Sequence, residues 1–288
     1  MKTQYIVSTD LDGTLLNHHD YQWQDAQQAL TSLASHNIPI IINTSKTRLE
    51  VANIVNALPI PKQSYVVENG SAIVLAPEYF NQIHPNIKHE HLQNINGQPV
   101  WVLGEKRETL CHWLYRLRDK YQWNFQGYQD WSVSQIIEKT GLSESEARAS
   151  SEKEFSEPFQ WYDTQDNLQK LTDAANLSGY KIVKGGRFYH LQGNVNKAAL
   201  FDFILDHKRE FYPGFDNIQF IALGDNHNDV DMLNQADYSI VIKSPTETII
   251  ELTKSKQVIH SQSFGAKGWN EEILTLIQSL NLSTKNEK

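Results

Sequence analysis

Short, continuous runs of apolar residues recur near both ends of this chain, and segments predicted as helices separate them. The apolar runs cover residues 5–7, 38–42, 65–67, 72–75, 218–223 and 238–242. The helices between or beside them are expected at residues 23–35, 49–58, 195–203 and 228–233. Strands that are apolar throughout are typical of a parallel sheet with helices on both faces. The chain is therefore expected to contain an α/β domain.

The middle of the chain has a different pattern, which predicts a separate unit. Residues 77–97 are polar, and helices are expected further on at residues 105–121, 142–155 and 165–177. Ser143 would begin the second of these helices, because Glu146 follows it at capping-box spacing. Two short strands are then expected at residues 180–183 and 188–191. Helices together with a short hairpin indicate an α+β unit.

The α/β pattern resumes after this hairpin, so one domain is interrupted by another. The last helices are expected at residues 246–253 and 269–280, followed by a polar tail at 283–288. The insert has about a hundred residues, which is a normal domain size. We therefore predict a core domain of residues 1–84 and 191–288, with an inserted domain of residues 85–190.

Composition excludes several classes of protein. The net charge of −8 argues against sequence-independent binding of nucleic acid. No apolar run approaches the length of a membrane span, and the N-terminus lacks the pattern of a signal peptide. Because Cys111 is the only cysteine, a disulfide within the chain and a multi-cysteine zinc site are both excluded. These features fit a protein of the reducing cytoplasm.

Two carboxylates follow the first predicted strand, in the sequence Asp10-Leu11-Asp12-Gly13-Thr14. Charge at the end of a buried strand is costly unless a metal or a reaction needs it. Asp10 can serve as a nucleophile and Asp12 as a proton donor, and both can lie close to a divalent cation. The alternative is an ordinary Asp-Gly turn after a strand.

A second acidic group, Asp225 and Asp229, follows the strand of residues 218–223. Ligands bind beyond the carboxyl ends of the strands in a parallel sheet, so these two residues would meet Asp10 and Asp12 at one edge. Four carboxylates held together would repel one another without a cation, and hard oxygen ligands favour Mg²⁺. In the alternative interpretation, Asp225 and Asp229 only cap the following helix.

Two further segments have the chemistry of a phosphate site. Thr44, Ser45 and Lys46 follow the strand of residues 38–42 and precede a helix, where hydroxyl and N–H groups suit a phosphate oxygen. Lys197 would supply a cation near the transferring oxygens. The alternatives are an ordinary helix cap for the hydroxyl residues and a solvated surface position for the lysine.

Taken together, Asp10-x-Asp12-Gly-Thr, Thr44, Lys197 and Gly224-Asp225-x-x-Asn228-Asp229 resemble the four motifs of the haloacid dehalogenase superfamily of phosphohydrolases. The resemblance implies a Rossmann-like parallel-sheet core with an inserted α+β cap over the active site. It implies that Asp10 accepts the phosphoryl group and that Asp12 acts as general acid and then as base. Mg²⁺ would be held by Asp10, the carbonyl of Asp12 and Asp225, with Asp229 nearby. Thr44, Lys197 and Asn228 would bind the phosphate or the substrate.

The insert resembles one family within this superfamily, the mannosyl-3-phosphoglycerate phosphatases. The matching segments are residues 43–47, Glu68-Asn69-Gly70-Ser71-Ala72-Ile73, 154–159 and 185–191. The resemblance implies Mg²⁺-dependent hydrolysis of mannosyl-3-phosphoglycerate to mannosylglycerate and phosphate. Arg187 would pair with the substrate carboxylate, Lys46 and Lys184 would add positive charge, and Ser45 would bind the phosphate or the substrate. Glu157 and His190 would hydrogen-bond to sugar hydroxyls.

Three other functions stay open at this point. The first is hydrolysis of another sugar phosphate, namely glucosyl-3-phosphoglycerate, sucrose phosphate or a hexose phosphate. The second is phosphoryl transfer between sugars, as in a phosphomannomutase, and the third is non-catalytic sensing of a sugar phosphate. In each case the partner is a small phosphorylated sugar, with neither nucleic acid nor a membrane, and the protein is expected to be a monomer or a homodimer.

Overall fold

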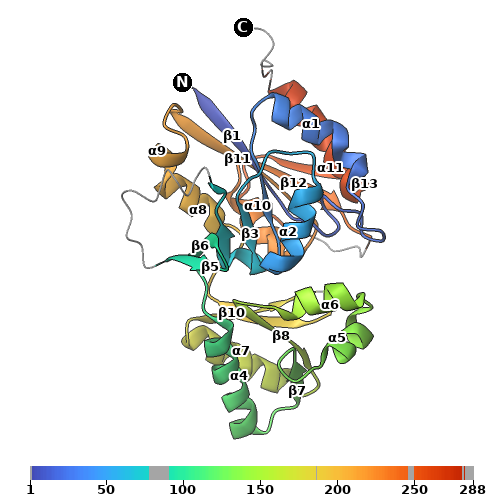
Figure 1. Ribbon diagram of the computed structural model, residues 1–288, viewed down its shortest axis with the longest axis vertical. Helices are drawn as coiled ribbons and strands as arrows, with labels where there is room; N and C mark the ends of the chain where they lie inside the picture. Colours follow the sequence, from blue (N-terminus) through green and yellow to red (C-terminus); the bar gives the residue numbers. More distant parts are fainter. Residues whose placement is uncertain (1, 78–90, 186, 246–249, 281, 283–288) are drawn as a thin grey trace.

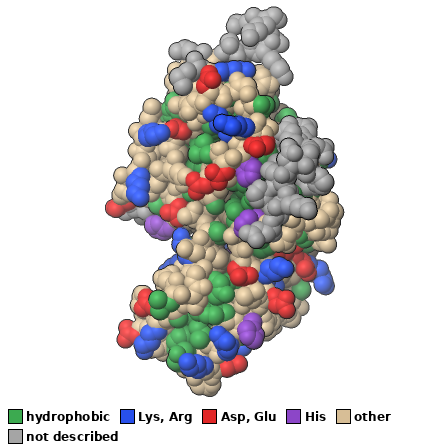
Figure 2. All heavy atoms as spheres, turned by 90° about the vertical axis from the view of Figure 1, so that its left-hand side faces the viewer, with side chains coloured by type: hydrophobic (Ala, Val, Ile, Leu, Met, Phe, Trp, Pro, Cys, Tyr) green, Lys and Arg blue, Asp and Glu red, His purple; other side chains and the backbone are tan. Residues whose placement is uncertain are grey.

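The computed structural model describes residues 2–77, 91–185, 187–245, 250–280 and 282, which form two lobes joined by a narrow waist (Figure 1). The larger lobe contains both ends of the chain and a nine-stranded sheet, and the smaller lobe contains a four-stranded sheet. Figure 2 shows the molecular surface narrowing between the lobes. None of the helices in the described ranges is long and apolar enough to cross a membrane.

The larger sheet has the strand order β13-β12-β11-β1-β2-β3-β4-β6-β5. The first six strands in this order are parallel, and the last three pair in antiparallel fashion. Their bounds are β1 Thr3–Thr9, β2 Ile40–Asn43, β3 Tyr65–Val67, β4 Ala72–Val74, β5 Leu92–Ile95, β6 Gln98–Val102, β11 Asn217–Gly224, β12 Tyr238–Lys243 and β13 Val258–Phe264. The prediction of an α/β core with a parallel sheet is confirmed.

Helices cover both faces of this sheet because its strands are apolar on both sides. Val7 faces one hydrophobic cluster and its neighbour Ile6 faces the other. The first cluster includes residues of helices α1 Gln27–Ser35, α2 Arg48–Ala57 and α11 Gly265–Ser279. The second includes residues of α8 Ala199–Asp206, α9 Lys208–Phe211 and α10 Val230–Gln235. The carboxyl ends of the parallel strands are left free for a site.

The smaller lobe, here called the cap, is an antiparallel sheet in the order β7-β8-β10-β9 with helices packed against it. Its strands are β7 Phe125–Gly127, β8 Ser156–Trp161, β9 Tyr180–Lys184 and β10 Tyr189–Gly193. Its helices are α4 Arg107–Tyr121, α5 Val133–Thr140, α6 Glu144–Ser151 and α7 Gln165–Leu177. Side chains of α4 and α7 join Phe159 and Leu191 of the sheet in one cluster. The prediction of an inserted α+β unit is confirmed.

Several expected elements differ in detail from the structure. The helix expected at residues 142–155 is confirmed as α6 with its Ser143 capping box, but it ends at Ser151 because strand β8 begins soon after. Residues 250–253 are not helical, and residues 246–249 and the tail at 283–288 lie outside the described part of the chain. Strands β5, β6, β7, β8 and β13 and helix α5 were not predicted from the sequence.

Strands β5 and β6 lie on the inserted side of the boundary predicted at residue 85, yet they pair into the nine-stranded sheet through β4. Trp101 faces the core cluster that contains Phe203, which explains why this hairpin belongs with the core. We therefore propose that the chain enters the cap at residues 103–106 and returns to the core at residues 194–198.

Candidate active site

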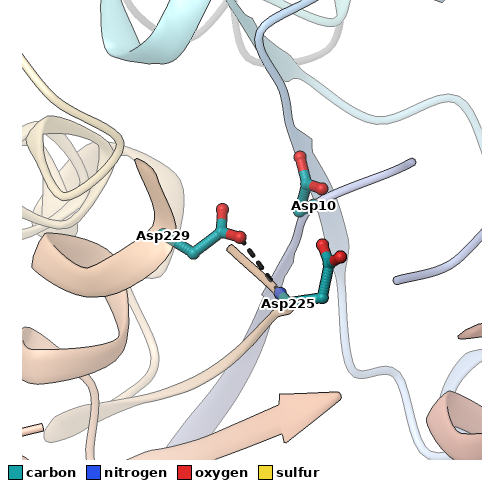
Figure 3. Close-up of side chains that lie close together, drawn as sticks. All are labelled: Asp10, Asp225 and Asp229. Carbon is teal, nitrogen blue, oxygen red and sulfur yellow. Dashed lines mark hydrogen bonds between the residues drawn. The ribbon is translucent and has the colours of Figure 1, made fainter. Parts of the chain in front are cut away.

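Three aspartates meet at the carboxyl edge of the parallel sheet. Asp10 follows β1 and Asp225 follows β11, and the two strands are neighbours in register. The backbone N–H of Asp10 donates to the carbonyl of Leu223 at 3.0 Å, so β1 and β11 end side by side. Oxygen atoms of Asp10, Asp225 and Asp229 lie within 4.8 Å of one another (Figure 3). The convergence predicted from the strand order is confirmed for these three residues.

The loops around the aspartates are shaped by close contacts. Gly13 has a φ of +81°, and a Cβ atom there would lie 2.6 Å from a carboxylate oxygen of Asp225. Glycine therefore allows the first loop to approach the second. Thr14 Oγ1 then donates to Asp225 Oδ1 at 3.1 Å. These contacts fix the direction of the Asp225 side chain.

Asp229 belongs to a capping box in which Asn226 is the N-cap residue, so the capping alternative is partly correct for Asp229, but its carboxylate also has another partner. Its Oδ2 accepts hydrogen bonds from the N–H groups of Asp225 at 3.1 Å and Asn226 at 3.0 Å (Figure 3). Its Oδ1 lies 2.6 Å from the ammonium group of Lys197. Both oxygen atoms of Asp229 therefore have partners. These contacts suit a residue that holds Asp225 and Lys197 in place.

Lys197 is fully buried, so the surface alternative for this lysine is wrong. Its Nζ lies 2.6 Å from Asp10 Oδ1 as well as 2.6 Å from Asp229 Oδ1. Burial disfavours the charged amine, but the carboxylates of Asp10 and Asp229 outweigh this effect and raise the pKa of Lys197. The side chain of Asn43 donates to the carbonyl of Lys197 at 2.8 Å and fixes the start of its turn.

Negative charge exceeds positive charge at this edge of the sheet. Burial, together with the charges of Asp10 and Asp229, raises the pKa of Asp225 to about 8. Burial also raises the pKa of Asp10 to about 6, against the opposing effect of Lys197. A divalent cation would relieve this repulsion, and carboxylate oxygens are ligands that Mg²⁺ prefers. The donor set of Asp10 and Asp225 therefore fits a hard cation.

Asp12 is not a member of the oxygen cluster that Asp10, Asp225 and Asp229 form. Its Oδ2 lies 2.9 Å from the ammonium group of Lys46, and its Oδ1 is buried without a hydrogen-bond partner among the described residues. Burial raises the pKa of Asp12 despite the opposing charge of Lys46. The Asp12 carboxyl group thus pairs with Lys46, whereas Asp10 pairs with Lys197.

The segment 43–47 forms a tight loop before α2. The N–H of Lys46 donates to Thr44 Oγ1 at 3.2 Å, and the N–H of Thr44 donates to the carbonyl of Val66 at 3.1 Å. The residue that caps α2 is Thr47, which forms a capping box with Glu50. Because Thr44 is not the cap, the capping alternative does not explain its hydroxyl group. Residues 44–46, which the sequence predicts to bind phosphate, are called the phosphate loop below.

A cavity of about 290 Å³ lies between this edge of the core and the cap. Its core side includes Asp10, Asp12, Ser45 and Asp225, and its cap side includes Arg187 and His190. A wider pocket of about 920 Å³ shares Arg187 and Asn228 with the cavity and adds Lys181 and Lys184. The candidate residues Ser45, Arg187 and Asn228 therefore line the cavity itself, whereas Lys184 lines the neighbouring pocket.

The cap residues differ in what they can reach. Burial lowers the pKa of His190 to about 3, with Lys153 contributing, so this cavity residue is neutral. Glu157 is fully buried inside the cap, 2.7 Å from Arg107 and 2.8 Å from the hydroxyl of Tyr115. Its carboxylate is thus engaged within the cap rather than at the cavity.

Sequence reasoning missed two residues at the boundary between the lobes. Lys153 in the cap donates to the carbonyl of Ser45 in the phosphate loop at 2.9 Å. Asn69 accepts a hydrogen bond from Asn228 at 3.1 Å and lies beside the cavity. Asn69 stood in the segment of residues 68–73 that resembles the phosphatase family, but its Asn-Gly turn has an ordinary structural explanation and no role was assigned to it.

The fold, the aspartate cluster and the buried lysine define a class of protein. The profile of the haloacid dehalogenase-like hydrolases matches residues 7–263, so the chain belongs to this family. A protein from Persephonella marina, named glucosyl-3-phosphoglycerate/mannosyl-3-phosphoglycerate phosphatase, is 32% identical over 96% of this chain and 98% of its own length. A protein of the same name from Methanococcoides burtonii is 29% identical over 95% of this chain and 97% of its own length. The chain is a phosphoric monoester hydrolase related to these phosphatases.

Solved structures of the same fold include two phosphatases. A haloalkanoate-superfamily phosphatase from Bacteroides thetaiotaomicron has a TM-score of 0.64 and 16% identity, with 98% of this chain and 96% of that chain covered. The sucrose-phosphatase from Synechocystis has a TM-score of 0.58 and 13% identity, with 99% of this chain and 100% of that chain covered. At this identity the likeness is one of fold.

Proposed function

We propose that this protein is a Mg²⁺-dependent phosphatase of glycosyl-3-phosphoglycerates, which hydrolyses mannosyl-3-phosphoglycerate to mannosylglycerate and phosphate. The observation that carries the proposal is the cluster of Asp10, Asp225 and Asp229 beside Lys197, at a cavity that Arg187 borders from the cap. The names of the two relatives support the same substrate class.

Asp10 is the nucleophile in this proposal. Its free Oδ attacks phosphorus while the bond to the leaving glyceryl oxygen breaks, and Asp12 donates its proton to that oxygen. Asp12 then accepts a proton from a water molecule that attacks the aspartyl phosphate, which releases phosphate and regenerates the Asp10 carboxylate. The raised pKa of Asp12 suits a group that must carry a proton in the first step.

Lys197 and the phosphate loop orient the reacting groups. The ammonium of Lys197 fixes one oxygen of Asp10 and leaves the other to attack, and its charge offsets charge on the phosphoryl oxygens. Thr44 and Ser45 bind the phosphoryl group in this proposal, together with Asn228, which lines the same cavity as Ser45. Asp10, Asp225 and the carbonyl of Asp12 would hold Mg²⁺, with Asp229 nearby, and the ion would supply further positive charge at the phosphoryl group.

The remaining anionic group of the substrate is its carboxylate. Arg187 lies on the cap side of the cavity, and Lys184 lies in the adjoining pocket, so both are placed to attract it. Lys46 is paired with Asp12, and we propose that it orients that carboxyl group as well as adding charge near the substrate. A monomer or homodimer in the cytoplasm stays a prediction from the sequence.

The experiment compares kcat/KM for mannosyl-3-phosphoglycerate, glucosyl-3-phosphoglycerate, sucrose phosphate and mannose 6-phosphate with Mg²⁺ present. We expect the two phosphoglycerates to be preferred by about tenfold or more, because they alone carry the carboxylate. Arg187→Met should reduce kcat/KM for the phosphoglycerates and leave the rate for mannose 6-phosphate nearly unchanged. Equal rates for all four substrates would contradict the substrate assignment, and transfer of phosphate to a sugar instead of water would favour a phosphotransferase.

A further inference from the structure

Three consecutive residues between β3 and β4 have backbone conformations that side chains disfavour. Glu68, Asn69 and Gly70 have φ values of 48°, 57° and 93°. Glycine adopts such values freely and asparagine tolerates them, but a glutamate there is strained. Strain of this kind persists only where surrounding contacts hold it, and it gathers at functional sites.

The backbone of this tripeptide holds the phosphate loop. The N–H of Glu68 donates to the carbonyl of Lys46 at 3.1 Å, and the N–H of Asn69 donates to the carbonyl of Thr44 at 3.0 Å. These two bonds bracket Ser45, which lines the cavity. The shape of the loop therefore depends on the strained conformation of Glu68 and Asn69.

The side chain of Glu68 crosses from the core to the cap. It is 1% exposed, and its carboxylate accepts hydrogen bonds from the N–H of Glu154 at 2.8 Å, the N–H of Phe155 at 3.3 Å and the hydroxyl of Ser156 at 2.5 Å. Glu154 and Phe155 directly precede β8, and Ser156 is its first residue. Two further contacts join the core to the cap nearby. Arg48 of the core pairs with Glu154 at 2.8 Å, and Lys153 of the cap donates to the carbonyl of Ser45.

Asn69 and Gly70 connect the same turn to the remaining motifs. The side chain of Asn69 accepts from Asn228 and donates to Gln192 of β10 at 3.3 Å. A Cβ atom on Gly70 would lie 1.9 Å from the carbonyl oxygen of Asn196, so the turn also packs against the residue before Lys197. The tripeptide thus contacts the phosphate loop, the second acidic motif, the lysine segment and two strands of the cap.

We propose that Glu68 is a positioning residue that docks the cap onto the phosphate loop, so that cap residues reach the substrate only when this loop has its reactive shape. The choice of substrate in this proposal rests on the proposed function. The contacts of Glu68 with the cap do not depend on that function. Docking by Glu68 matters for a substrate that must contact the cap. A small phosphate ester, which needs only the core, depends on it much less.

The test uses Glu68→Gln, which keeps the shape of the side chain but turns an N–H group toward donors of β8. The control is Glu144→Gln, at an exposed carboxylate whose ion-pair partner among the described residues is Arg148 of its own helix. Amide hydrogen exchange at Glu154 and Phe155 should become about tenfold faster in Glu68→Gln and stay unchanged in the control. The kcat/KM for mannosyl-3-phosphoglycerate should fall about tenfold or more, whereas that for p-nitrophenyl phosphate should change by less than about threefold.

Unchanged exchange at Glu154 and Phe155 would overturn the proposal, and so would an equal loss of activity toward both substrates, since that would indicate general disruption. If the wild type hydrolyses p-nitrophenyl phosphate but not the phosphoglycerates, the proposed substrate is wrong while the exchange measurement still tests Glu68. Ser156→Ala removes one bond from the cap side without touching the strained turn. It should accelerate exchange in the same direction even if Glu68→Gln does not fold, and no acceleration there would count against docking.

Discussion

The ammonium group of Lys197 lies 2.6 Å from Asp10 and also 2.6 Å from Asp229, with no exposed surface on the lysine. A buried cation between two carboxylates stabilises the folded protein and at the same time fixes the direction of Asp10, the proposed nucleophile. Removing one member of such a buried set leaves charge without compensation, which costs far more than breaking an exposed pair. Stability and reactivity of this site are therefore linked through one side chain.

Lys197→Met is predicted to lower the free energy of unfolding by about 3–5 kcal/mol and to abolish phosphatase activity. The matched control is Lys256→Met, because Lys256 also lies 2.6 Å from a carboxylate, that of Asp237, but is 73% exposed. The control should cost about 1 kcal/mol or less. Urea unfolding without divalent cations measures both values. Equal losses in the two variants would show that burial of Lys197 has no energetic consequence.

Gly70→Ala is predicted to be much more destabilising than Gly97→Ala. Both glycines have positive φ, 93° and 80°, so both substitutions impose backbone strain of about 1–2 kcal/mol. At Gly70 the new Cβ would meet the carbonyl oxygen of Asn196, while at Gly97 no atom of the described residues lies within 4 Å of it. We expect a further loss of about 2 kcal/mol or more at Gly70, measured as the difference between the two unfolding free energies. A difference near zero would contradict the close packing of the turn against Asn196.

His190 is predicted to make the folded state sensitive to acid. Burial, with a contribution from Lys153, lowers its pKa from 6.5 to about 3, so the unfolded chain takes up a proton that the folded chain does not. The stabilising contribution is therefore complete above pH 6.5 and is lost as the pH falls toward 3. Between pH 6 and 4, the wild type should lose up to about 1.4 kcal/mol per pH unit more than His190→Gln. Parallel curves of unfolding free energy against pH for the two proteins would contradict this prediction.

Much of the core site could be predicted because it depends on local pattern and on a rule of topology. Asp10 and Asp225 each follow an apolar strand, and parallel strands bring their carboxyl ends to one edge. The same reasoning could not assign the partner of Lys197, which pairs with Asp10 across 187 residues of sequence. It also could not predict that Asp12 lies outside the cluster of the other aspartates, because the Asp12 carboxylate pairs with Lys46 and the sequence does not show this contact.

The cap was less predictable, because its polar residues have structural partners far away in the chain. Glu157 was expected to contact sugar, as an isolated acid in a distinctive segment, but it pairs with Arg107 inside the cap. Strand β8 was missed because Glu157 and Pro158 interrupt its apolar pattern, although both residues are buried. Strands β5 and β6 were missed because they lie in or beside a polar stretch of sequence that lacks the pattern of a strand. They form a hairpin because β6 pairs with β4 of the core sheet.

In the proposed mechanism Asp10 accepts the phosphoryl group, and Asp12 first donates a proton to the leaving oxygen and then accepts one from water. The most direct test is rapid acid quenching of Asp12→Asn after mixing with radiolabelled p-nitrophenyl phosphate and Mg²⁺, since p-nitrophenolate leaves without a proton from Asp12. Labelled phosphate should accumulate on the peptide that contains Asp10, because the asparagine cannot activate water, and Asp10→Asn should carry no label. Release of p-nitrophenolate by Asp12→Asn with no label on Asp10, or with label on another residue, would contradict the account.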